Sequence, residues 1–171
     1  FFLDDINAAC LIFLGRSREM RTLSPKTREH VERLIKAVIL NLYAAHNLEM
    51  ALLAVSNALV YLPGEKWLYR QRDRIAIEKS FKEGNFEAAS RLARRCYEEG
   101  TDPDIAQQCL AILKHCVLTA VAKGDAALEA RCLENEIAVL PKDLFRRVQL
   151  SLAYYRLGRY DDARAMWEKI I

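Results

Sequence analysis

Four prolines recur along the chain at an almost constant interval, and this interval restricts the possible folds more than any other feature. Successive prolines are separated by 38, 40 and 38 residues, and they are Pro25, Pro63, Pro103 and Pro141. A second series lies between them, with separations of 38, 40 and 34 residues, and it consists of His46, Gly84, Gly124 and Gly158. A fixed interval of this length is typical of stacked structural repeats. Each repeat is therefore predicted to contain two segments joined by a turn.

The segments between these markers have the periodicity of α-helices. Apolar residues recur every three or four positions, as in Leu34, Val38, Leu42 and Ala45. Ser24 before Pro25 and Asp102 before Pro103 are typical of helix starts, and glycine suits the left-handed position that ends a helix. The pattern predicts no strand and nine helices, over residues 4–20, 25–45, 48–62, 65–83, 85–100, 103–123, 125–139, 141–157 and 160–171.

The turns between these helices are short, so consecutive helices are expected to form antiparallel hairpins. Hairpins must stack to bury their remaining apolar faces, which predicts an all-α helical solenoid. The composition agrees with a folded chain, because 52% of the 171 residues are hydrophobic and 29% are charged. The net charge of +3 is too small to indicate a nucleic-acid or membrane surface by itself.

Two further features concern the cellular environment. The five cysteines lie at apolar helical positions without a CxxC pair, which indicates buried thiols in a reducing compartment: Cys10, Cys96, Cys109, Cys116 and Cys132. The longest strongly apolar stretch runs over residues 8–14 and is too short to cross a bilayer, so no membrane span is expected. The chain begins at Phe1 without an initiator methionine, and we expect a fragment whose missing part holds an anchor or another domain.

A family likeness appears in the last repeat. It reads Leu150-Ser151-x-x-Tyr154-x-x-x-Gly158-x-Tyr160-x-x-Ala163-x-x-x-Trp167-x-x-Ile170 and resembles the tetratricopeptide repeat. The same frame fits residues 38–63, with His46 in place of glycine, and residues 84–96. The repeat around Gly124 is degenerate, because Glu129 stands at the alanine position unless a one-residue shift brings in Ala130.

This resemblance implies a right-handed α-α superhelix of about four helix-turn-helix repeats plus an N-terminal helix. The expected solenoid spans residues 23–171, with repeats at about 32–65, 66–102, 103–140 and 141–171. Residues 1–22 are expected to form a capping helix or part of a truncated repeat. A HEAT or Sel1 repeat is the alternative all-α reading. The final repeat is expected to leave Trp167 and Ile170 uncovered.

The sequence offers no recognisable catalytic apparatus. It lacks GxGxxG, P-loop, GxSxG and HExxH motifs, and Cys109 and Cys116 are seven residues apart without a second ligand pair. The acidic pairs at residues 4–5 and 161–162 fall in first helical turns, where they complement the helix dipole. We therefore expect a non-enzymatic protein with no metal, cofactor or small-molecule substrate.

The resemblance implies that the first helix of each repeat lines a concave groove for a partner protein or peptide. The groove positions are Arg33, Lys36, Leu40 and Tyr43 in the first repeat, Gln71, Arg74, Glu78 and Phe81 in the second, Lys114, His115 and Leu118 in the third, and Gln149, Leu152 and Tyr155 in the fourth. Cations beside apolar groups suit an acidic partner with apolar anchors. The alternative is that Leu40, Phe81 and Tyr155 pack against neighbouring helices and the cations form a solvated face.

Two other functions are also compatible with the sequence. Arginine clusters at residues 70–74, 91–95 and 146–147 raise the possibility of nucleic-acid binding, but acids alternate with them, as on a solvated helix face. The family also includes cytoplasmic adaptor domains of membrane-tethered secretion or exopolysaccharide-export components. The expected location is cytoplasmic, with tethering to a membrane only through residues outside this chain.

Overall fold

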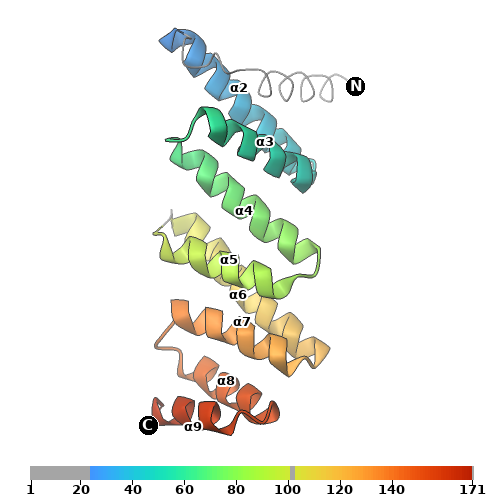
Figure 1. The fold of residues 1–171 in the computed structure, drawn as a ribbon, viewed down its shortest axis with the longest axis vertical. Helices are drawn as coiled ribbons and strands as arrows, with labels where there is room; N and C mark the ends of the chain where they lie inside the picture. The colour runs from blue at the N-terminus through green and yellow to red at the C-terminus, as the bar shows by residue number, and fades with distance from the viewer. Residues whose placement is uncertain (1–23, 101–102, 171) are drawn as a thin grey trace. The chain divides into compact units, whose positions relative to one another are not determined.

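The computed structural model describes residues 24–100 and 103–170, and within them all regular structure is helical (Figure 1). The described helices are α2 (Pro25–Ala44), α3 (Leu48–Tyr61), α4 (Lys66–Lys82), α5 (Phe86–Glu98), α6 (Pro103–Lys123), α7 (Ala126–Val139), α8 (Leu144–Arg156) and α9 (Tyr160–Glu168). The prediction of an all-α chain is confirmed, and each predicted helix end lies within three residues of the end observed. The helix expected over residues 4–20 lies outside the described residues.

The turns inside the hairpins have the geometry that the glycine series predicts. Gly84, Gly124 and Gly158 adopt φ values of 77°, 67° and 72°, and His46 adopts 56° at the equivalent place. These values lie in the left-handed region that glycine adopts most readily. The second marker series therefore locates the turn between the two helices of each hairpin.

Side chains cap the N-termini of five helices, and of these caps only Ser24 was predicted from the sequence. Ser24 accepts a hydrogen bond from the Thr27 amide at 3.2 Å, as expected for a serine that precedes proline. Four further caps accept equivalent bonds from the amide three residues later: Asn47, Asn85, Asp125 and Asp143. Because Asp143 supplies the cap, α8 begins at Leu144 and not at Pro141, where the sequence pattern placed it.

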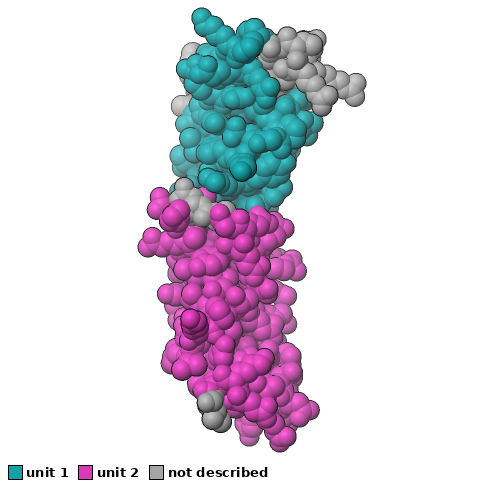
Figure 2. All heavy atoms as spheres, turned by 90° about the vertical axis from the view of Figure 1, so that its left-hand side faces the viewer, with its two compact units in different colours: residues 1–79 teal, residues 80–171 magenta. Residues whose placement is uncertain are grey.

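The chain divides into two compact units, residues 1–79 and residues 80–171 (Figure 2). In unit 1, α2 packs against α3, and the core of the unit includes the fully buried Ile39, Val55 and Ile75. In unit 2, α5 packs against both α6 and α7, α7 also packs against α6 and α8, and α8 packs against α9. One core runs through these helices and includes Val117, Leu133 and Leu150.

Small residues are buried at equivalent positions of three hairpins. Ala51, Ala89 and Ala163 occupy the alanine position of the repeat frame, and all three are buried. In the degenerate repeat that position holds Glu129, which is also buried, and its Oε2 lies 2.7 Å from Nη2 of Arg156 in α8. A cross-helix ion pair thus accommodates the acidic side chain where the other repeats place a methyl group.

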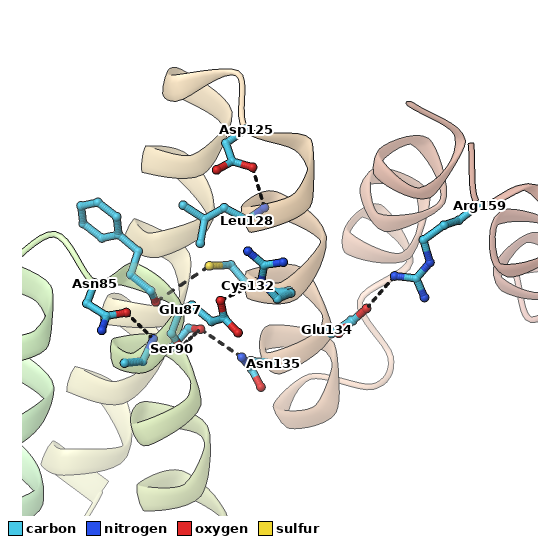
Figure 3. Close-up of polar contacts among 12 residues, drawn as sticks. Asn85, Glu87, Ser90, Asp125, Leu128, Cys132, Glu134, Asn135 and Arg159 are labelled. Carbon is cyan, nitrogen blue, oxygen red and sulfur yellow. Dashed lines mark hydrogen bonds and ion pairs between the residues drawn. The ribbon is translucent and has the colours of Figure 1, made fainter. Parts of the chain in front are cut away.

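Polar contacts also join α5 to α7 within unit 2 (Figure 3). The buried Ser90 accepts a hydrogen bond from Asn135 Nδ2 at 3.0 Å, and Glu87 pairs with Arg131 at 2.8 Å. The Cys132 thiol points toward the main-chain oxygen of Phe86, 3.9 Å away. These contacts set how α5 and α7 pair, because each polar group is matched only in one register.

Candidate functional site

The predicted binding positions fall into a common frame when they are counted back from the hairpin turn. Ten residues before the turn residue lie Lys36, Arg74 and Lys114. Six residues before it lie Leu40, Glu78, Leu118 and Leu152, and three residues before it lie Tyr43, Phe81, Val121 and Tyr155. All of them belong to the first helices of the hairpins, namely α2, α4, α6 and α8. The structure shows which of these side chains contact a neighbouring helix and which face solvent.

In unit 1 the predicted positions of α2 contact α4 directly. The Lys36 ammonium lies 5.6 Å from the centre of the Trp67 ring, and the Arg74 guanidinium lies 4.7 Å from the centre of the Tyr43 ring. The Tyr43 hydroxyl also donates a hydrogen bond to Glu78. Burial is the main cause that raises the pKa of Tyr43, and the bond to Glu78 adds to it. Three predicted site residues, Tyr43, Arg74 and Glu78, are therefore brought together between two helices, while Lys36 contacts Trp67, which was not predicted.

Three other predicted positions of unit 1 have different surroundings. Arg33 is exposed and pairs with Glu29 of its own helix at 3.3 Å. Gln71 is buried, so it does not offer its side chain to a ligand in this structure. Leu40 stands exposed, with 46% of its surface accessible. The alternative that Leu40 packs against a neighbouring helix is therefore not supported.

In unit 2 the predicted His115 lies against an aromatic cluster. Its ring meets Phe81 edge-on, with centroids 5.2 Å apart, and Phe81 meets Phe86 in the same way at 5.2 Å. The Lys123 ammonium lies 4.5 Å from the centre of the Phe86 ring. Phe81 thus packs against neighbouring helices, which was the alternative to a ligand-binding role.

Glu136 is a buried carboxylate that was not predicted as a site residue, and two more of the predicted residues act on it or on its partner. Glu136 of α7 is fully buried, and its Oε2 lies 3.2 Å from Nε of Arg146 in α8. Arg146 in turn donates a 2.7 Å hydrogen bond to Gln149. Burial raises the pKa of Glu136, while the charges of Arg146 and Lys114 oppose this rise. Gln149 of α8 thus bonds to the arginine that pairs with Glu136, and the charge of Lys114 of α6 acts on the same carboxylate.

The remaining predicted positions are exposed apolar side chains of α6 and α8. Leu118 is 61% exposed, Leu152 is 50% exposed and Tyr155 is 64% exposed. Val121, which was not predicted, is 45% exposed and stands at the position in α6 that corresponds to Tyr155 in α8. The edge of the Tyr155 ring contacts Tyr160, with centroids 5.3 Å apart. Unit 2 therefore presents several large apolar side chains to solvent from its first helices.

The described residues hold little that resembles catalytic chemistry. Among residues 24–100 and 103–170, no group of three or more His, Cys, Asp or Glu side chains is placed to bind a metal ion. Cys96, Cys109, Cys116 and Cys132 are buried and free of disulfide bonds, as expected, and Cys10 lies outside the described residues. Burial raises the pKa of the Cys116 thiol to about 12, which makes the thiolate rare at neutral pH.

Helix α6 is apolar enough, by length and composition, to cross a membrane. Its most apolar window has a mean hydropathy of 1.5, whereas the longest strongly apolar stretch was predicted at residues 8–14, which lie outside the described residues. The mostly buried core helix of a soluble protein passes the same test, and 28% of this window is buried in the structure.

No family model, curated protein or solved structure matches this chain. The likeness to tetratricopeptide repeats therefore depends on residues of this sequence alone. Three observations of the structure are compatible with this likeness: the left-handed turn residues, the buried alanines of the frame and the helical hairpins.

Proposed function

We propose that this chain is a tetratricopeptide-like scaffold that binds a partner protein, without catalysis, through the exposed face of its first helices. The observation that carries the proposal is the exposure of Leu118, Leu152 and Tyr155. Several large apolar side chains gathered on one face are typical of interaction sites, whereas single exposed ones are common on any surface. The helices hold these side chains in place before binding, which lowers the ordering cost of association.

Nucleic-acid binding has less support than protein binding. In two of the arginine clusters, guanidinium groups pair with carboxylates: Arg72 with Asp73 at 2.8 Å and Arg94 with Glu98 at 2.7 Å. In the third cluster, Arg146 pairs with the buried Glu136. Phosphate binding would have to break these pairs, and the counterion release that drives it would be correspondingly smaller.

The proposal is tested by affinity capture from a lysate of the source organism with three forms of the chain. They are the native chain, the double variant Leu118→Ser with Leu152→Ser, and the control variant Val60→Ser. Val60 is a matched control because it is an apolar side chain of α3 and is 72% exposed. We expect a retained protein that the native and control chains share and that the double variant loses, with unchanged helicity by circular dichroism. Capture of no protein, or equal capture by all three forms, would contradict the proposal.

A further inference from the structure

Two of the buried cysteines occupy equivalent places on the two sides of a hairpin turn. Cys116 of α6 lies eight residues before the turn glycine Gly124, and Cys132 of α7 lies eight residues after it. At 1.5 Å per residue, each cysteine lies about 12 Å along its helix from the same turn. Because α6 and α7 pack against each other, these equal distances place the two cysteines at one level of the hairpin.

The two thiols also share one apolar environment. Neither residue exposes any of its surface, and both belong to the core of unit 2 that contains Val117 and Leu133. Burial is the main cause that raises the pKa of Cys116, and the charge of a Cys132 thiolate adds to this rise. The two sulfur atoms are therefore close enough for the charge of one to act on the other.

The other described cysteines are less suited to bond with either member of this pair. Cys109 lies on α6 seven residues before Cys116, which is about 10.5 Å along the helix axis. A disulfide requires Cα atoms within about 7 Å of each other. The Cys132 thiol lies 3.9 Å from the main-chain oxygen of Phe86 at the start of α5 (Figure 3), whereas Cys96 lies ten residues, or about 15 Å, further along α5. Among the described cysteines, Cys116 and Cys132 are therefore the pair that the helices bring together.

We propose that Cys116 and Cys132 form a redox-sensitive pair, which a low-molecular-weight disulfide such as oxidised glutathione converts into a disulfide between α6 and α7. In the first step, the thiolate of one cysteine attacks oxidised glutathione, forms a mixed disulfide and displaces one glutathione thiolate. The thiolate of the second cysteine then attacks the sulfur of the first and displaces the other glutathione thiolate. Two S–H bonds are lost and one S–S bond forms between the helices, while two protons and two electrons pass to glutathione.

Burial determines when this reaction takes place. The thiolate is the attacking form, and burial raises the pKa of both thiols, that of Cys116 to about 12. The closed hairpin therefore reacts slowly at neutral pH, and oxidation follows local opening of α6 and α7. In a reducing compartment the pair remains a dithiol, and the same residues form the disulfide when the surroundings become oxidising.

The disulfide would stabilise unit 2, because it closes a loop within the unfolded chain. Fifteen residues lie between Cys116 and Cys132, and a loop of this length should lower the equilibrium constant of unfolding by about a hundredfold. The pair thus converts oxidising conditions into greater stability of the α6–α7 hairpin. This inference concerns the core of unit 2 and does not depend on the proposed partner binding.

The test is peptide mapping of the folded chain after incubation with oxidised glutathione, with free thiols blocked before digestion. Trypsin places Cys116 and Cys132 in separate peptides, residues 115–123 and 132–142, and keeps the other two described cysteines together in residues 96–114. We expect the first two peptides to be linked, and dithiothreitol to release them. The linked chain should unfold at a higher urea concentration than the reduced chain.

Two variants serve as controls, with circular dichroism as the check that each is folded. Cys116→Ala should lose both the link and the shift of the urea midpoint. Cys109→Ala removes another buried thiol of α6 and should retain both. The mapping of the native chain decides the inference even where a variant does not fold.

Three results would overturn the inference. The first is that residues 115–123 and 132–142 are not linked in the folded native chain, or are linked to residues 96–114 instead. The second is that the link forms only in chain unfolded by urea. The third is that the linked chain is no more stable than the reduced chain.

Discussion

The turn residue His46 permits a quantitative test of the repeat frame. His46 adopts a φ of 56°, while the glycines at the equivalent turns adopt values from 67° to 77°. A left-handed conformation costs an L-residue about 1–2 kcal/mol, which glycine avoids. Glycine also raises the conformational entropy of the unfolded chain, which lowers the free energy of unfolding by about 0.4–1 kcal/mol. The substitution His46→Gly is therefore expected to stabilise the chain by about 0.5–1 kcal/mol.

Two further variants separate the backbone effect from the imidazole. His46→Ala removes the ring and its contacts but keeps the Cβ atom, so it should not share the stabilisation. Gly124→Ala introduces the Cβ atom at a turn where nothing lies within 4 Å of it, so steric clash does not contribute. The free energy of unfolding of this variant should fall by about 0.5–1 kcal/mol, because alanine at this turn must adopt the left-handed conformation that glycine adopts without cost.

The free energies of unfolding are to be measured by urea titration, followed by far-ultraviolet circular dichroism. The midpoints are compared only where the m-value is unchanged. The reasoning is refuted if His46→Gly is less stable than His46→Ala, or if Gly124→Ala is as stable as the native chain. Either result would mean that the two turns do not share the strained position that the repeat frame assigns to them.

Three other substitutions test the packing of unit 2, with unfolding by urea as the measurement. Ala163→Leu should destabilise the chain by about 1–3 kcal/mol, because the alanine is buried at a helix contact; an unchanged midpoint would contradict this. Arg156→Met should lower the free energy of unfolding by about 1–3 kcal/mol, because it leaves the buried Glu129 without its ion-pair partner. Adding Glu129→Ala should restore most of this stability. Burial raises the pKa of Glu136, so the folded state holds that proton more tightly and stability falls as the pH rises through the raised pKa. Glu136→Gln should therefore gain stability relative to the native chain as the pH rises from the ordinary pKa of a glutamate through the raised pKa of Glu136, and a difference independent of pH would refute the assignment.

The positions of the helices were predictable because their boundaries depend on local chemistry. Proline at a first helical position and glycine at a left-handed turn are read from single residues and their spacing. The start of α8 was predicted at Pro141. It lies after Asp143 instead, because Asp143 accepts the capping hydrogen bond from the Arg146 amide. Asn47 and Asn85 could have been found in the same way, since each follows a turn residue and precedes an apolar residue that begins a helix.

The roles of the predicted site residues were less predictable than their positions. Tyr43 and Tyr155 occupy the same place in the frame, yet Tyr43 contacts Arg74 and Glu78 while Tyr155 is exposed. The difference depends on which side chains the next helix presents, and a local pattern does not contain that information. The buried Glu136 is a similar case, because its partner Arg146 lies on another helix.

The arginines of α8 show which kind of contact remains available for a partner. Arg146 and Arg156 pair with buried glutamates of α7, and Arg147 donates to the main-chain oxygens of Pro141 and Lys169. The positive charge of α8 is thus used to join helices, and the large apolar side chains that α8 offers to solvent are Leu144, Phe145, Leu152 and Tyr155.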